Sequence, residues 1–222
     1  MNTANPMRAS IGLLVCFAVK EEAAFVMPLP QVKGGRDSLV TGMGRRNAST
    51  HLREALTRVR PERLLTCGFA GALDPALKIG DVLFDEDFDA GFGGALRTAG
   101  ARPGKFHCSL RVATTSAEKA SLYKTTGAHA VEMESSVIRT LCREQRIPSA
   151  TVRVISDTAQ EDLPLDFNAL MTAEQNLSML KLAVALMRSP RVVPRLLDLQ
   201  RNTRLAARRL ADVLQELLRS AG

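Results

Sequence analysis

Short apolar runs alternate with amphipathic stretches along most of this chain, and that alternation limits the possible folds more than any single motif does. The expected strands are residues 11–19, 38–44, 63–72, 79–88, 107–115 and 149–156, and the expected helices are residues 46–59, 116–127 and 135–146. Strands separated by helices form a mainly parallel sheet covered on both faces. We therefore predict an α/β fold with a mixed, mainly parallel central sheet flanked by helices.

The chain has 222 residues, enough for one sizeable core. We predict a single domain over residues 8–187, followed by a basic amphipathic helical extension over residues 188–222. Residues 89–105 hold five Gly and one Pro, which is typical of a loop. Residues 166–187 carry apolar side chains at three- and four-residue spacing, which predicts helix.

The formal net charge of +7 is concentrated in the last 35 residues. Eight Arg against Asp198, Asp212 and Glu216 give +5 from residue 188 onward. A basic amphipathic helix of this kind lies on an anionic membrane in some proteins, which predicts a peripheral membrane contact. The alternative is a helix that packs on the domain or on a second subunit with its Arg side chains in solvent. Aromatic residues are only 4%, so we expect no nucleic-acid partner.

The four Cys are isolated and the three His are scattered, so we expect neither a disulfide framework nor a metal site. Free Cys inside apolar runs, such as Cys16 and Cys67, indicates a reducing compartment, and we expect a cytoplasmic protein. No apolar run reaches the roughly 18 residues that a membrane span needs.

Polar residues follow several of the expected strands. They are Glu21-Glu22, Gly42 to Gly44, Gly68 to Gly71, Thr114-Thr115, Glu132 to Glu134 and Ser156-Asp157. Ligands of parallel α/β sheets bind at the carboxyl ends of the strands, so we expect these residues to converge on one edge.

Each motif also has a simpler interpretation. Gly68 and Gly71 would let a ligand approach the backbone, or would serve only a tight strand exit. Arg45, on a glycine turn that begins a helix, would suit an anion, or would lie in solvent. Asp157 would be a helix cap or a general acid. Glu22 would open a helix, where acids suit the dipole.

The order of these features resembles the nucleoside phosphorylase/nucleosidase superfamily. Glycine turns follow the second and third strands, then come V-E-M-E-S (131–135) and V-R-V-I-S-D (152–157), with G-F-A-G-A-L-D-P-A-L-K-I-G-D-V (68–82) as a further likeness. The chain resembles 5'-methylthioadenosine/S-adenosylhomocysteine nucleosidases and bacterial hopanoid-associated phosphorylases over roughly residues 11–187. The resemblance implies cleavage of the N-glycosidic bond of a purine nucleoside, with adenine as the expected base, by hydrolysis or phosphorolysis, and a homodimer.

The resemblance also implies roles for individual residues. Asp157 would protonate the leaving purine and Glu22 would activate water. Glu134 would bind the ribose hydroxyls, and a carboxylate suits a vicinal diol because it has two acceptor oxygens. The supporting residues would be Met133 against the sugar, Gly71 under the base or sugar, Ser156 orienting the acid, Arg153 in the network around it, and Glu132, whose role stays open.

The chain departs from the family pattern at Phe69, where nucleosidases usually carry Ser, and in its short segment between Val82 and Thr114. That segment usually supplies an aromatic wall for the base, for which Phe88, Phe92 or Phe106 would substitute. Arg45 would bind phosphate, the one co-substrate we expect, if the reaction is phosphorolysis. The alternatives to an enzyme are a nucleoside-binding relative without turnover and a membrane-surface protein of hopanoid-type metabolism.

Overall fold

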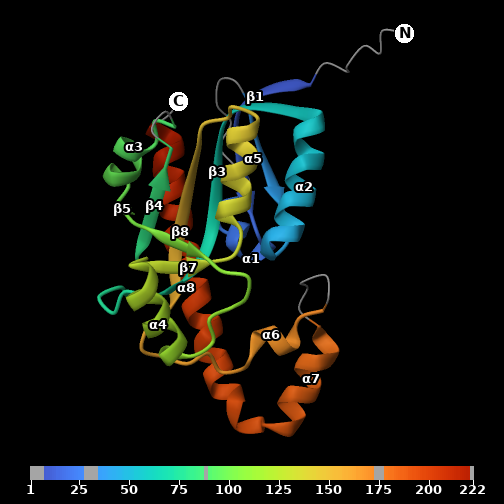
Figure 1. Cartoon of the computed structure of the whole chain (residues 1–222), viewed down its shortest axis with the longest axis vertical. Helices are drawn as coiled ribbons and strands as arrows, with labels where there is room; N and C mark the ends of the chain where they lie inside the picture. The colour runs from blue at the N-terminus through green and yellow to red at the C-terminus, as the bar shows by residue number, and fades with distance from the viewer. Residues whose placement is uncertain (1–7, 28–34, 88–89, 173–177, 221–222) are drawn as a thin grey trace.

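The computed structural model describes residues 8–27, 35–87, 90–172 and 178–220. Eight strands within these residues form one sheet. The strands are β1 (Ala9–Phe17), β2 (Arg36–Val40), β3 (Val59–Ala72), β4 (Val82–Glu86), β5 (Arg102–Pro103), β6 (Phe106–Cys108), β7 (Ala130–Glu132) and β8 (Ser149–Asp157). The helices are α1 (Lys20–Ala23), α2 (Gly44–Arg58), α3 (Gly93–Thr98), α4 (Ser116–Thr126), α5 (Ser135–Glu144), α6 (Phe167–Leu170), α7 (Met179–Arg188), the 3-10 turn η1 (Pro190–Val192) and α8 (Val193–Ser220) (Figure 1).

The sheet has the strand order β2-β1-β3-β8-β4-β5, and β7 pairs with both β3 and β6. β1 is parallel to β2 and β3, and β3 is parallel to β8. β4 runs antiparallel to β8, and β7 antiparallel to β3. The predicted mixed, mainly parallel sheet is therefore confirmed.

Helices cover both faces of the sheet (Figure 1). On one face, Leu52 of α2 and Ile138 of α5 pack in a cluster with Leu14 and Leu64. On the other face, α8 packs on the sheet together with α1 and α3. The buried side chains of α8 are Ala206, Ala207, Leu210, Ala211, Val213, Leu214, Leu217 and Leu218. The apolar side expected of the last helix is therefore part of the same core as the sheet.

Two local predictions were wrong. The segment expected to be a loop contains α3 and β5. The Glu86 carboxylate accepts hydrogen bonds from the backbone N–H groups of Phe92 and Gly93, at 2.8 and 2.9 Å, so a side chain of β4 supplies the cap that the Gly-rich sequence lacks. The strand expected over 107–115 is only β6, because the chain leaves the sheet after Cys108 and Val112 instead bonds the Asn168 side chain.

Helix ends follow local sequence more closely. The Thr115 hydroxyl accepts the N–H of Glu118 at the start of α4, and Gly127, with φ of 60°, ends that helix. The helical stretch expected over 166–187 contains α6 and α7, and residues 173–177 lie outside the described residues. No helix in the described ranges is long and apolar enough to span a membrane.

Candidate functional site

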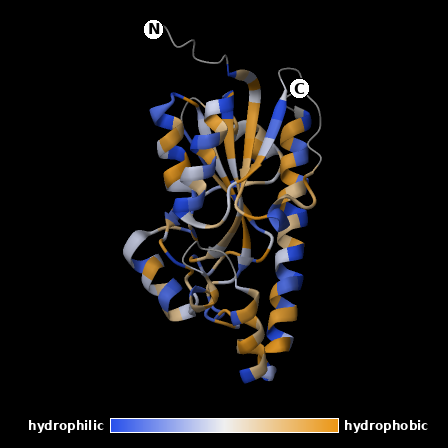
Figure 2. Cartoon of the chain, turned by 90° about the vertical axis from the view of Figure 1, so that its right-hand side faces the viewer, coloured by the Kyte–Doolittle hydropathy of each residue, from blue (hydrophilic) through white to orange (hydrophobic). Residues whose placement is uncertain are grey.

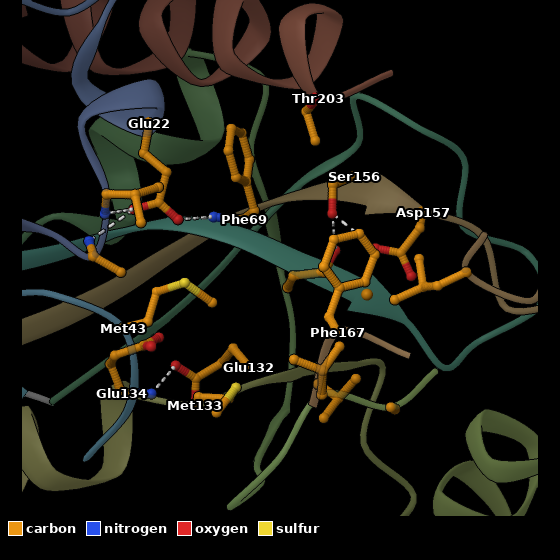
Figure 3. Close-up of a pocket in the computed structure, with 18 of the residues that line it drawn as sticks. Glu22, Met43, Phe69, Glu132, Met133, Glu134, Ser156, Asp157, Phe167 and Thr203 are labelled. Carbon is orange, nitrogen blue, oxygen red and sulfur yellow. Dashed lines mark hydrogen bonds between the residues drawn. The ribbon is translucent and has the colours of Figure 1, made fainter. Parts of the chain in front are cut away.

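A pocket of about 260 Å³ opens where the parallel strands end, and it collects most of the residues that the sequence singled out. Its lining includes Glu22, Gly71, Glu132, Met133, Glu134, Ser156 and Asp157, which come from α1, β3, the β7–α5 junction and β8 (Figure 3). The expected convergence of strand ends is thus present for these residues. Leu199 and Thr203 of α8 and Phe167 of α6 also line the pocket.

Glu22 is a buried carboxylate held by backbone N–H groups. Phe69 donates to one oxygen at 2.8 Å, and Ala18 and Val19 donate to the other at 2.7 and 3.1 Å. Burial raises the pKa of Glu22, although Arg153 and these N–H groups oppose the shift. A carboxyl group with a raised pKa, fixed at a pocket wall, is suited to accept a proton from water.

The two glycines of β3 make room for the two carboxylates. A Cβ atom at Gly68 would lie 2.4 Å from Glu22 Oε1, and one at Gly71 would lie 2.9 Å from Asp157 Oδ2. Each glycine therefore allows an acid to lie against the strand, which neither of the two interpretations of the G-x-x-G stretch had foreseen. Gly71 also lines the pocket.

Arg153 and Glu132 form a buried ion pair at the pocket wall, with Glu132 in the lining and Arg153 behind it. Arg153 Nη2 lies 2.9 Å from Glu132 Oε2, and Glu132 also accepts the backbone N–H groups of Glu134 and Ser135 and the Ser135 hydroxyl. Burial would raise the pKa of Glu132, but Arg153 and the Ser135 bonds outweigh it, so the pKa lies below its usual value. Arg153 is absent from the pocket lining, and its guanidinium donates to Glu132, to Thr66 and to the Val152 carbonyl instead of facing the cavity.

Glu134 faces the cavity with fewer partners. Its Oε1 accepts the Gly44 N–H at 2.7 Å, and its Oε2 lies 3.9 Å from Arg153 Nη2. Burial, opposed by the attraction of Arg153 and aided by the neighbouring Glu132, raises the pKa of Glu134 to about 7. Met133 and Met43 line the same wall (Figure 3).

Asp157 has a protein donor on each of its oxygens. The Ser156 hydroxyl donates to Oδ1 at 2.8 Å, and the Lys119 ammonium donates to Oδ2 at 2.6 Å. Lys119, fully buried in α4, also donates to the carbonyl oxygens of Thr158 and Glu161 at 2.7 and 3.1 Å. Its three N–H donors are thus all used, and they fix both the acid and the loop that follows it.

Arg45 and Arg111 differ in their access to the pocket. Arg45, the candidate phosphate ligand, is outside the lining and donates to the Cys108 carbonyl at 2.7 Å. Arg111 is the one cationic side chain in the described lining, and it is paired with Glu118. No group of three or more His, Cys, Asp or Glu side chains in the described ranges is placed to hold a metal ion.

The aromatic side chains of the pocket are Phe69 and Phe167. Of the phenylalanines proposed for the base wall, Phe92 packs in the core beneath Arg63, and Phe106 packs on a cluster that includes Ala70, Ala130 and Ile155. Neither lines the pocket, so the substitution expected of them was wrong, and Phe88 lies outside the described residues.

Sequence reasoning missed Lys119, Phe167, Leu199 and Thr203. In the sequence, Lys119 is one charged residue among others at the start of an expected helix. Only the distance of 2.6 Å from its ammonium to Asp157 Oδ2 shows that it belongs to the site. The lining residues of α6 and α8 lie in helices whose approach to the sheet depends on tertiary packing.

Comparisons with known proteins agree with this architecture. The family model of the phosphorylase superfamily matches residues 31–113 and 101–219. The 5'-methylthioadenosine/S-adenosylhomocysteine nucleosidase of Staphylococcus aureus (strain MRSA252) is 26% identical over 171 residues, covering 61% of this chain and 75% of that protein.

Solved structures share the fold at low sequence identity. The Helicobacter pylori 5'-methylthioadenosine/S-adenosyl homocysteine nucleosidase, in complex with a pyrrolidine-based ligand, superposes with a TM-score of 0.69 at 15% identity, covering 96% of this chain and 100% of that one. Futalosine hydrolase of Helicobacter pylori gives 0.64 at 16% identity, covering 93% and 98%. The family match spans well over half of the residues, and the chain therefore belongs to the phosphorylase superfamily.

Proposed function

We propose that this protein cleaves the N-glycosidic bond of a purine nucleoside, with adenine as the base, by hydrolysis. The observation that carries the proposal is that Glu22, Glu134 and Asp157, three of the four carboxylates in the described lining, share one otherwise mainly apolar pocket. The curated relative in Staphylococcus aureus is a nucleosidase for 5'-methylthioadenosine and S-adenosylhomocysteine, which supports the same bond and base.

The leaving base needs a proton, because a purine anion leaves poorly. Asp157 is the donor in our proposal, and Ser156 and Lys119 hold its two oxygens. As the C–N bond breaks, the base takes a proton from Asp157, and the Lys119 ammonium at 2.6 Å stabilises the carboxylate that remains.

The ribose is held at the opposite wall. Glu134 accepts hydrogen bonds from the two vicinal hydroxyls through its two oxygens, and Met43 and Met133 provide an apolar surface beside the sugar. Glu22 takes a proton from water as the water attacks the positively charged sugar carbon. The water oxygen thereby becomes the new hydroxyl at that carbon, and the bonding electrons leave with the protonated base.

Base release from a nucleoside panel tests the proposal. Purified protein is incubated with adenosine, inosine, 5'-methylthioadenosine and S-adenosylhomocysteine, and free base is measured by liquid chromatography with and without phosphate. We expect release of adenine without phosphate, and we expect Asp157→Asn to lose at least about a hundredfold in rate. Tight binding of these nucleosides without release of any base would instead establish a non-catalytic binding protein.

Phosphorolysis is the second candidate, and Arg111 is the observation that favours it. Arg111 is the cation in the described lining of the pocket, although it is paired with Glu118. Release of base that requires phosphate and yields a sugar 1-phosphate, and that falls in Arg111→Gln but not in Arg45→Gln, would replace hydrolysis with this reaction.

A further inference from the structure

The helix α7 is apolar but has no buried residue. Eight of its ten residues are Met, Leu, Val or Ala, yet none of its side chains is buried. The chain on either side of α7 is also unburied: none of the described residues from Met171 to Leu205 is buried, and the next buried residue is Ala206. We call residues 178–205 the α7–α8 elbow, which projects beyond the carboxyl ends of the strands (Figure 1).

An isolated helix of ten residues is marginal in water, because most helical stability in proteins comes from packing of an apolar face. The elbow instead exposes large apolar side chains, among them Leu180 at 76%, Met187 at 75% and Leu197 at 50%. Six of the ten exposed large hydrophobic residues in the described chain lie on the elbow; the other three there are Met179, Val193 and Leu205. Figure 2 shows this apolar character at the end of the molecule remote from both termini. Such a concentration indicates a binding surface.

The charge of the elbow indicates what that surface binds. Residues 178–205 contain six cations, Lys181, Arg188, Arg191, Arg195, Arg201 and Arg204, and one acid, Asp198. Exposed apolar and cationic side chains on one helical segment are the combination that inserts shallowly into the headgroup region of an anionic bilayer. We propose that the α7–α8 elbow docks this protein on an anionic lipid surface.

A second copy of the chain fits the elbow less well. A two-fold dimer with the elbow on its axis would place the elbow against its own copy, so that two surfaces of net charge +5 would meet. The proposed surface also differs from the membrane contact considered for residues 188–222, because the apolar side of the C-terminal half of α8 is used by the core. The membrane contact would come from α7 and from the first half of α8.

The elbow includes part of the pocket wall. Leu199 and Thr203 of α8 line the pocket, and the exposed side chains of Leu197 and Leu205 belong to the same helix. A docked molecule therefore holds its pocket close to the lipid surface. The proposal stands on these exposures and charges and does not depend on the reaction that the pocket performs.

Vesicle co-sedimentation tests the proposal without any substrate. The full-length protein is spun with vesicles of phosphatidylcholine alone and with vesicles that contain phosphatidylglycerol, at low and at high salt. We expect binding to the anionic vesicles that weakens in high salt. Arg188→Glu with Arg191→Glu should lower the partition coefficient at least about tenfold, and Leu180→Gln with Met187→Gln at least about fivefold.

Matched controls use exposed residues of the same types elsewhere. Leu110→Gln, at a side chain that is 73% exposed, and Arg60→Glu should leave vesicle binding unchanged. Absence of binding to anionic vesicles, or equal binding to neutral ones, would overturn the proposal. So would a dimer in sedimentation velocity that Leu180→Gln with Met187→Gln dissociates, because a second copy would then cover the elbow.

Discussion

Replacing Gly68 with Ala tests the geometry of the site most directly. The added Cβ would lie 2.4 Å from Glu22 Oε1, 2.8 Å from its Cδ and 2.9 Å from its Oε2. Carbon and oxygen atoms that are not bonded normally stay more than 3.0 Å apart, so the carboxylate must move by roughly 1 Å. Three backbone N–H donors hold the carboxylate in its present position, so the movement costs hydrogen bonds.

A displacement of about 1 Å at a reacting group costs on the order of a hundredfold in rate. We therefore expect Gly68→Ala to lower kcat for base release by about that factor, with a smaller change in KM, since the ribose ligand Glu134 is untouched. Gly71→Ala should cost less, because its Cβ would meet only one carboxylate oxygen, at 2.9 Å. Steady-state kinetics of both variants show which of the two substitutions lowers kcat more.

The matched control is Gly94→Ala, where the added Cβ meets nothing within 4 Å. It should retain the kinetics of the parent protein. Thermal unfolding of all three variants separates loss of fold from displacement of the acid. Parental kcat in a folded Gly68→Ala protein would refute the assignment of Glu22 as a reacting group.

Three further predictions concern the buried charges. Lys119→Met should lower kcat by roughly tenfold to a hundredfold with little change in KM, and an unchanged kcat would remove Lys119 from the reaction. Arg153→Met should destabilise the fold by about 3–5 kcal/mol at pH 8 in urea unfolding and by less at pH 5, where the acids around it take up protons; an equal loss at both pH values would contradict the role of Arg153 as their counter-ion. Glu134 has a folded pKa of about 7 against a usual 4.5, so the folded state binds the extra proton, and its stability falls as the pH rises through that window. Glu134→Gln should therefore raise the free energy of unfolding at pH 8 by an amount on the order of 3 kcal/mol, seen as a higher Tm, and leave Tm nearly unchanged at pH 4. The same variant should bind nucleosides more weakly. A lower Tm at pH 8 would contradict the raised pKa.

The fold was largely predictable, because strand and helix periods are local properties of the sequence. The parts that were missed depend on contacts between distant residues. α3 begins where the carboxylate of Glu86, on another element, caps it, and nothing within residues 92–98 signals this. The shortness of β6 likewise follows from the Asn168 side chain, which bonds both backbone groups of Val112 and holds the chain away from the sheet.

The candidate site was predictable to the extent that its residues follow strands. Glu22, Gly71, Met133, Glu134, Ser156 and Asp157 all come at strand ends and all line the pocket. Lys119 lies in the first turn of a helix and not at a strand end, so its burial against Asp157 is a consequence of how α4 docks on the 157–161 loop. The exposure of α7 could not be predicted either, because its apolar spacing is that of an ordinary core helix.

Glu132 and Glu134 show what the structure adds to a short acidic motif. Two buried carboxylates two residues apart, with one guanidinium nearby, cannot both be fully compensated. Arg153 takes the closer one, and Glu132 receives three further hydrogen bonds, so its acceptor capacity is used within the protein. Glu134 keeps one hydrogen-bond donor in the described residues, the Gly44 N–H, and its pKa is raised accordingly. A buried carboxylate with unused acceptor sites binds hydroxyl donors best. The two hydroxyls of a ribose diol would therefore donate to Glu134 rather than to Glu132.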